Sequence, residues 1–151
     1  MSDAREAALL RASRLTEETN FLAVKTAVRG SKLANDALGA YGLRVRSYSV
    51  LALAVCEVAV TQRDLAAALS LDPSQVVSLV DDLEASGLVR RVVDPSDRRS
   101  RVIQATSAGR DSYLRARVAT AEAEARQLEA LTPLERETLR DLLARVVVAG
   151  A

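Results

Sequence analysis

The chain has one cysteine and no histidine among its 151 residues. A lone cysteine cannot form an intramolecular disulfide. Without histidine, the chain cannot build a Cys/His zinc site or a histidine-dependent catalytic triad. The remaining carboxylates, lysines, tyrosines and single thiol form no paired site in the sequence. We therefore expect no enzymatic activity, no cofactor and no bound metal.

Aromatic residues are also scarce, at 3% of the chain, whereas hydrophobic residues of all kinds make up 49%. The core must therefore consist mainly of Leu, Val and Ala, which suits closely packed helices. No apolar run reaches the length of a membrane span, and Asp3 and Glu6 stand where a signal peptide needs an apolar stretch. We expect a soluble, cytoplasmic protein with no membrane partner.

Charge of either sign is nearly balanced, because 21 basic and 20 acidic side chains leave a net charge of +1. The balance is uneven along the chain, however. Between Arg90 and Arg101 there are five arginines (90, 91, 98, 99 and 101) and only two aspartates (94 and 97). A local basic concentration of this kind is what a nucleic-acid-binding surface requires.

Two helix starts follow one another closely after residue 60. Thr61 with Asp64 three residues later predicts a capping box. Asp72, followed by proline, predicts a second start, with Asp72 as N-cap and Gln75 reaching back to it. The second helix has a buried stripe, and a glycine that can end it in a left-handed conformation. These residues are Val76, Leu79, Val80, Leu83 and Gly87.

A hairpin is predicted immediately after these helices. Two β-prone runs, Leu88–Val93 and Arg101–Gln104, flank the polar segment from Asp94 through Pro95 and Ser96 to Ser100. Ala59-Val60 is expected to add a very short strand. Two short helices with a brief link, followed by an arginine-tipped hairpin, predict a winged helix-turn-helix. The expected fold class is mainly α with a small β wing.

Long helices are predicted on both sides of this module. One covers Ser2 to about Leu38, with Asn20 and Gly30 as points where it bends or breaks, and the next runs from Arg44 to about Val58. After the wing, Thr106 is expected to cap a long helix with an apolar and small-residue stripe at Leu114, Val118, Ala121, Ala125 and Leu128.

A last helix is predicted to begin at a capping box formed by Thr132 and Glu135. Its apolar stripe consists of Leu139, Leu142, Leu143, Val146 and Val147. A chain this short cannot easily bury several long amphipathic helices within itself. We therefore expect the terminal helices to pair with a second subunit.

The segment LAAALSLDPSQVVSLVDDLEASGLVRRVVDPSDRRSRVIQATSAG resembles the core of the MarR family of bacterial transcriptional regulators. The motifs that carry the resemblance are Leu83-Glu84, Gly87-Leu88-Val89 with Arg91, Asp97-Arg98-Arg99, and then Thr106 and Gly109. The resemblance implies a single MarR-type domain over residues 1–151. A winged-helix DNA-binding lobe is expected at about 44–105, and dimerisation helices at about 3–38 and 107–149.

The function that the resemblance implies is sequence-specific binding of a pseudo-palindromic duplex operator by a homodimer. We expect a repressor that a small aromatic effector releases from DNA. In this reading the helix Pro73–Ser86 enters the major groove, and its outward side chains read bases. The candidate readers are Ser74, Gln75 (for adenine), Val77 (for a thymine methyl) and Ser78.

The recognition helix departs from the family pattern, which often has Thr-Arg where this chain has Val77-Ser78. Residues 72–86 include four acidic side chains (72, 81, 82 and 84) and no lysine or arginine. Phosphate anchoring by this helix must therefore come from its N-terminal end and from serine hydroxyls. Affinity should accordingly depend more on the wing.

In the wing, Arg99 matches the family's arginine that enters the minor groove. Asp97 is expected to hold the Arg99 side chain through a charge-assisted hydrogen bond. Arg98 and Arg91 are candidates for phosphate contacts. Arg44 and Arg46 are further candidates at the start of their helix, and the alternative for them is a solvated pair of arginines.

Three residues raise alternatives. Tyr41 and Tyr48 are candidates for an effector pocket, and the alternative is that they are core tyrosines. Cys56 is expected to be buried late in its helix, which would raise the pKa of its thiol and make it inert; a redox-sensing regulator using Cys56 is the alternative. A winged-helix protein-interaction module, in which the acidic helix meets a basic partner, is a second alternative to DNA binding.

Overall fold

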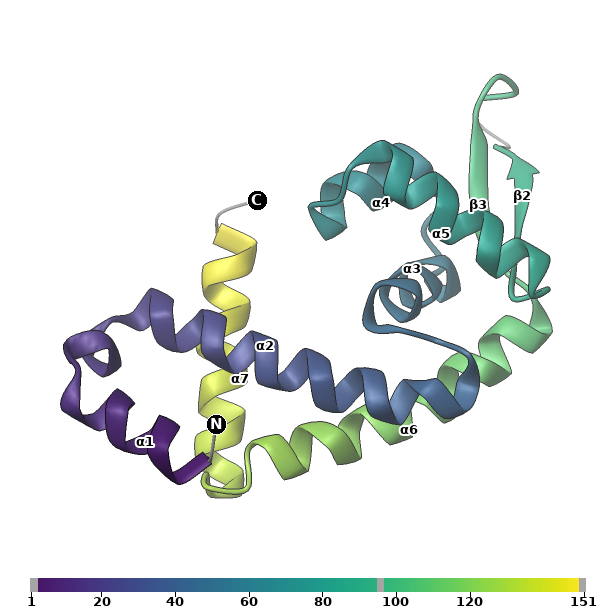
Figure 1. Ribbon diagram of the computed structural model, residues 1–151. Helices are drawn as coiled ribbons and strands as arrows, with labels where there is room; N and C mark the ends of the chain where they lie inside the picture. Colours follow the sequence, from purple (N-terminus) through teal and green to yellow (C-terminus); the bar gives the residue numbers. More distant parts are fainter. Residues whose placement is uncertain (1–2, 95–96, 150–151) are drawn as a thin grey trace. The chain divides into compact units, whose positions relative to one another are not determined.

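A computed structural model describes residues 3–94 and 97–149 (Figure 1), so Pro95 and Ser96 of the predicted hairpin tip lie outside the described residues. The prediction of a mainly α-helical fold with a β wing is confirmed. In chain order the elements are α1 (Asp3–Ala12), the 3-10 helix η1 (Arg14–Glu17), α2 (Thr19–Leu38), the 3-10 helix η2 (Gly39–Tyr41), α3 (Val45–Val55), β1 (Val60–Thr61), α4 (Gln62–Leu69), α5 (Pro73–Ala85), β2 (Val89–Val93), β3 (Arg101–Ala105), α6 (Ser107–Gln127) and α7 (Pro133–Ala149).

The chain divides into two compact units. One consists of residues 34–123 and contains the helix-turn-helix and the sheet. The other combines the two terminal parts of the chain, up to residue 33 and from residue 124 onwards. None of the described helices is both long and apolar enough to cross a membrane.

The helix-turn-helix has the predicted caps. The Thr61 backbone N and Oγ1 both donate to Asp64 Oδ2, at 2.9 and 2.7 Å, and Asp64 N donates to Thr61 Oγ1 at 3.2 Å. At the start of α5, Asp72 N donates to Gln75 Oε1 at 3.3 Å. Gly87 follows α5 with a φ of +70°, a left-handed conformation in which glycine avoids the strain of a side chain.

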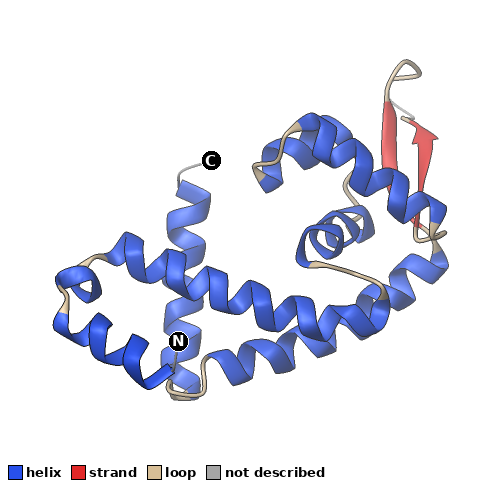
Figure 2. Cartoon of the chain, viewed as in Figure 1, coloured by secondary structure: helices blue, strands red, loops and turns tan. Residues whose placement is uncertain are grey.

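The three strands form an antiparallel sheet in the order β1-β3-β2. Figure 2 shows β2 and β3 as a hairpin that extends away from the helices around it. Arg91 lies opposite Ile103 in this hairpin, and β1 pairs with only two β3 residues, Val102 and Ile103. The predicted small strand is therefore present, one residue later in the chain than expected.

A core of aliphatic side chains holds the 34–123 unit together, as the scarcity of aromatics predicts. The inner face of α5 packs here with side chains from α3, α4 and the sheet. Burial of each large aliphatic side chain contributes roughly 1.5–3 kcal/mol. The largest fully buried side chains are Leu38, Leu51, Leu65, Ile103, Val50, Val76, Val80, Val89 and Val102.

The N-terminal helical run breaks at residues 13–18, so the prediction that Asn20 or Gly30 is the weak point is wrong. Ser13 ends α1, because its Oγ and backbone N both donate to the Leu10 carbonyl. Gly30 lies inside α2, where a Cβ would stand 2.5 Å from Gln127 Oε1. The glycine therefore permits a close approach of the Gln127 side chain and does not interrupt the helix.

Two other predicted helices differ in detail from the structure. The helix expected to reach Val58 ends at Val55. The predicted inward stripe of α6 is also wrong, because Leu114 and Val118 are 57% and 60% exposed. α6 instead buries Gly109, Ser112, Ala116 and Ala123, whose small side chains allow the helix to approach its neighbours closely.

The starts of α6 and α7 agree with the prediction. Thr106 Oγ1 accepts a hydrogen bond from Gly109 N at 3.0 Å and donates to the Gly87 carbonyl at 2.7 Å. Before α7, Thr132 N and Oγ1 donate to Glu135 Oε2 at 2.7 and 2.8 Å. Thr106 thus also attaches the first turn of α6 to the segment that follows α5.

Candidate nucleic-acid interface

The outward face of α5 carries three of the predicted base readers. Ser74, Val77 and Ser78 are exposed. Val76 and Val80, on the opposite face of the helix, are fully buried. Val77 is an apolar side chain that is 43% exposed. The outward face therefore combines two hydroxyl groups with one branched apolar side chain.

Gln75 differs from these three residues. It is half-buried, and its Oε1 accepts the hydrogen bond from Asp72 N that completes the cap of α5. The sequence pattern suggested both a capping role and a base-reading role for Gln75. The structure shows the capping hydrogen bond. A bidentate contact with adenine would require the amide to leave its capping position.

The described part of the wing tip is a tight turn. Ser100 N donates to the Asp97 carbonyl at 2.9 Å, and Asp94 N donates to the Ser100 carbonyl at 3.0 Å. Asp97, Arg98 and Arg99 are all exposed. Asp97 Oδ1 accepts from the backbone N of Arg99 at 3.0 Å. Asp97 therefore orders the backbone of the turn, whereas the sequence suggested a contact with the Arg99 guanidinium.

Arg91 has a different environment from the tip arginines. Its side chain is 25% exposed, and its guanidinium pairs with Asp81 at 2.5 Å and with Glu84. The Arg91 backbone N also donates to Glu84 Oε1 at 2.9 Å. Two hydrogen bonds hold the pKa of Glu84 below its usual value. The bond from this backbone N has the larger effect, and the bond from the guanidinium has the smaller one. The predicted phosphate contact thus has two carboxylates as competitors.

Arg44 and Arg46 are exposed at the start of α3. This start is attached to α2, because Asn35 Oδ1 accepts a hydrogen bond from Val45 N at 2.9 Å. Exposed arginines that were not among the predicted contacts include Arg63 on α4 and Arg90 on β2, which donates to Gln104 Oε1 at 3.4 Å. The position of Arg63 on the first helix of the helix-turn-helix, which crosses the DNA backbone in such motifs, was the signal that could have identified it.

The tyrosines and the cysteine lie around α3. Tyr48 stacks on Tyr113 of α6, with ring centroids 5.6 Å apart, and burial raises the pKa of the Tyr113 hydroxyl. Tyr41 is half-buried against the core. The prediction that Cys56 is buried is wrong. Because α3 ends at Val55, Cys56 is the residue that follows the helix, and it is exposed.

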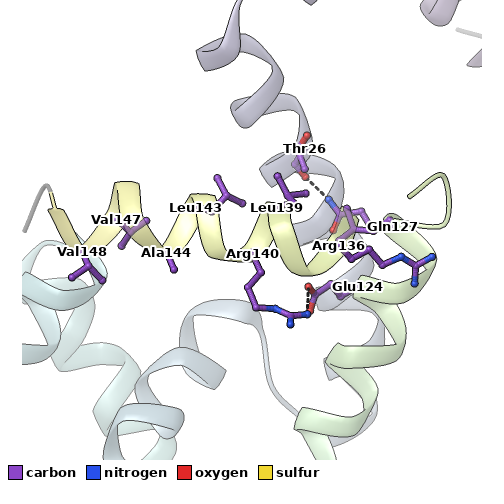
Figure 3. A pocket seen from close by; sticks show the side chains of 11 residues that line it. Thr26, Glu124, Gln127, Arg136, Leu139, Arg140, Leu143, Ala144, Val147 and Val148 are labelled. Carbon is purple, nitrogen blue, oxygen red and sulfur yellow. Dashed lines mark hydrogen bonds and ion pairs between the residues drawn. The ribbon is translucent and has the colours of Figure 1, made fainter. Parts of the chain in front are cut away.

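The terminal unit contains a groove of about 570 Å³ along α7, shown from close by in Figure 3. The Gln127 side chain at one end donates to the Thr26 carbonyl at 2.8 Å, and Arg140 pairs with Glu124 at 3.7 Å. The apolar side chains that line the groove come mostly from α7. They are Leu128, Leu139, Leu143, Ala144, Val147 and Val148.

The same helix exposes apolar side chains along most of its length. Leu142 and Leu143 are 50% and 49% exposed, and Val146 and Val147 are 73% and 71% exposed. Among the described residues of α7, none is fully buried. The apolar stripe that the sequence predicts for this helix is thus present; it is half-buried at Leu139 and exposed at its other four residues.

Comparisons with known proteins agree with the winged-helix geometry. The model of the MarR family matches residues 41–100. The crystal structure of a MarR-family transcriptional regulator from Rhodococcus sp. RHA1 is 41% identical, covers 87% of this chain and 94% of that chain, and has a TM-score of 0.81. CouR from Rhodococcus jostii RHA1, crystallised with p-coumaroyl-CoA, is 44% identical over 88% of this chain and 94% of that chain, with a TM-score of 0.77.

A transcriptional repressor, CouR, bound to a 23-mer DNA duplex is 28% identical, covers 89% of this chain and 95% of that chain, and has a TM-score of 0.79. A curated relative from Thauera aromatica, named as a transcriptional regulatory protein for the hcr operon, is 31% identical over 99 residues. That match spans 66% of this chain and 60% of the relative. The resemblance seen in the sequence motifs is thus confirmed, and the chain belongs to the MarR family of transcriptional regulators.

Proposed function

We propose that the protein is a homodimeric repressor that binds a pseudo-palindromic DNA operator and leaves it when a small aromatic effector binds. One observation carries the proposal. The exposed face of α5 and the arginine-bearing wing tip belong to the same compact unit. The opposite face of α5 is buried in the core of that unit. A recognition helix and a wing on one unit can engage adjacent parts of one duplex.

In this proposal α5 lies in the major groove. Val77 contacts a thymine methyl, and the hydroxyls of Ser74 and Ser78 contact base edges or phosphates. Gln75 reads adenine only if its amide leaves the cap of α5. Two of the four acidic side chains of this region, Asp81 and Glu84, are paired with Arg91, which lowers the negative charge that α5 brings to DNA.

The wing provides most of the electrostatic attraction. We place Arg99 in the minor groove, where guanidinium groups are favoured by the negative potential of narrow A·T-rich tracts. Arg98, Arg44 and Arg46 would contact phosphates, and exposed Arg63 adds a fourth candidate. Several arginine–phosphate contacts would make binding strongly dependent on salt concentration.

Self-association is supported by the open apolar surface of the terminal unit. The groove along α7 and the exposed Leu142, Leu143, Val146 and Val147 leave a large apolar area in water. Contiguous exposed apolar surface of this kind is typical of interaction sites. We propose that a second copy of the chain covers it, which would hold two α5 helices at the separation of successive major grooves.

The effector that we propose is an aromatic acid or its coenzyme A thioester. The support is similarity, because CouR from Rhodococcus jostii RHA1, at 44% identity, was crystallised with p-coumaroyl-CoA. The test is release of labelled duplex by p-coumaroyl-CoA, with free coenzyme A and p-coumarate as separate controls. Release by none of the three would exclude p-coumarate and its coenzyme A thioester as effectors.

DNA binding is tested by fluorescence anisotropy on duplexes that the protein selects from a random pool. A protein that contacts several phosphates through arginines should lose affinity steeply with salt, with a slope of about −0.9 per phosphate contact in a plot of log K against log salt. No duplex binding at low salt would overturn the proposal. A flat salt dependence would instead favour a protein-interaction module. Sedimentation velocity tests the dimer, and a monomer at micromolar concentration would contradict it.

A further inference from the structure

The guanidinium of Arg91 connects the first strand of the wing to α5. It reaches Asp81 and Glu84, which lie three residues apart and therefore on the same face of the helix. Glu84 is held twice by the same residue, since Oε1 accepts from the Arg91 backbone N at 2.9 Å and Oε2 accepts from its guanidinium. Because Glu84 binds the backbone of Arg91 as well as its side chain, it fixes the position of strand β2 itself.

The third strand pairs with only part of the wing. β1 pairs only with Val102 and Ile103, so the far half of the hairpin, at Val93 and Arg101, is a two-stranded ribbon. Two-stranded ribbons are marginally stable and twist freely. Arg91 lies opposite Ile103, within the three-stranded part of the sheet, and towards the tip the third strand ends at Val102, which faces Val92. A link from α5 to Arg91 therefore holds the three-stranded base from which the two-stranded ribbon extends.

The charges also make Arg91 a poor phosphate ligand. One guanidinium faces two carboxylates, so the group carries a net charge of −1 when all three side chains are ionised. A phosphate would have to displace a carboxylate from a guanidinium that is only 25% exposed. The exposed arginines at the tip, Arg98 and Arg99, face no such competition from this pair of carboxylates.

We propose that Arg91 is a positioning residue, which sets the direction of the wing relative to α5 through Asp81 and Glu84, and that it does not contact DNA. The inference rests on the proposed function, because it concerns how the same surface meets a duplex. With the hairpin held, the tip arginines and the outward face of α5 reach their grooves together. With the link broken, the wing samples other directions, and its arginines bind DNA only after they are ordered.

The test is a substitution of nearly the same size and shape that gives opposite results for the two roles. Glu84→Gln removes one negative charge and weakens the hold on Arg91. If Arg91 contacts phosphate, the released guanidinium and the lost carboxylate should both tighten binding. If Arg91 positions the wing, binding should weaken, by about three- to tenfold, which is near the lower end of the loss expected for removal of a minor-groove arginine.

Asp82→Asn is the matched control. Asp82 is exposed on the same helix and makes none of the ion pairs recorded among residues 3–94 and 97–149. Its replacement removes the same charge and leaves Arg91 paired, so affinity should rise by about twofold at low salt. Binding is measured by anisotropy on a labelled duplex selected with the wild-type protein, with the full chain, after the urea midpoint of each variant has been determined.

Arg91→Lys and an Arg99→Ala background complete the test. Lysine keeps the positive charge but cannot bridge two carboxylates in the same way, so a positioning role predicts weaker binding and a phosphate contact predicts little change. In the Arg99→Ala background, Glu84→Gln should cost much less, whereas a loss through general instability would add in full. Tighter binding by Glu84→Gln than by Asp82→Asn would overturn the positioning role and leave DNA binding intact. Absence of wild-type binding to any duplex would instead overturn the proposed function.

Discussion

Replacement of Gly109 by alanine should destabilise the protein, although alanine is the better helix former. Gly109 lies in the first turn of α6, and a Cβ there would collide with the Leu88 carbonyl oxygen. It would also stand 2.9 Å from the carbonyl carbon of Leu88 and 3.3 Å from its Cα. All three are backbone atoms of Leu88, so rotation of a side chain cannot relieve the overlap. The first turn of α6 must move away from residues 87–88.

The magnitude follows from the contacts that such a movement breaks. Thr106 N donates to the Leu88 carbonyl at 3.0 Å, and Thr106 Oγ1 donates to the carbonyls of Gly87 and Leu88 at 2.7 and 3.3 Å. The hydroxyl has one hydrogen, which the two carbonyls share, so these contacts amount to two hydrogen bonds of about 1 kcal/mol each, and their loss costs about 2 kcal/mol. The helix propensity of alanine returns about 1 kcal/mol. With some loss of packing around buried Ser112, we expect a net destabilisation of roughly 1–2 kcal/mol.

Urea unfolding at one fixed protein concentration measures this effect, because a dimer makes the midpoint depend on concentration. With m-values of about 1–3 kcal/mol/M, the midpoint should fall by roughly 0.5–1 M. Gly39→Ala is the control, since a Cβ at residue 39 meets nothing within 4 Å, and its midpoint should stay equal or rise slightly. A Gly109→Ala midpoint at or above that of the wild type would refute the close approach of α6 to Leu88.

Three further outcomes are expected. Arg99→Ala should weaken duplex binding by about 1–3 kcal/mol, mainly at A·T-rich flanks; unchanged anisotropy titrations would remove Arg99 from the minor groove. Leu143→Glu places a charge on the exposed apolar face of α7 and should shift the sedimentation coefficient towards the monomer with little loss of helical circular dichroism; an unchanged coefficient would argue against this face as the dimer contact. Hydrogen bonds from the backbone N and side chain of Thr132 hold the pKa of Glu135 below 4.5, so this cap stabilises the fold fully above that pH and is lost as the pH falls through the lowered value. The difference in urea midpoint between wild type and Glu135→Gln should therefore be largest near neutral pH and disappear in acid, and a difference that is constant with pH would contradict the assignment.

Features that depend on residues three or four apart were predictable from the chain alone. The caps formed by Thr61 with Asp64 and by Thr132 with Glu135 are present as predicted, and Gly87 ends α5 in the left-handed conformation. These interactions are complete within one turn, so their geometry does not depend on the rest of the molecule. The hairpin and the family followed from the same kind of local pattern.

Features that depend on contacts across the fold required the coordinates. Arg91 looked like one more wing arginine, but its ion-pair partners lie seven and ten residues away on another element. Cys56 looked buried, because the end of α3 could not be located within three residues. The inward face of α6 carries Gly109 and Ala116 and not Leu114, since close packing of backbones selected the small side chains. Local pattern specifies which helices and turns form, whereas the side chains that become paired, buried or open to solvent depend on which elements the folded chain brings into contact.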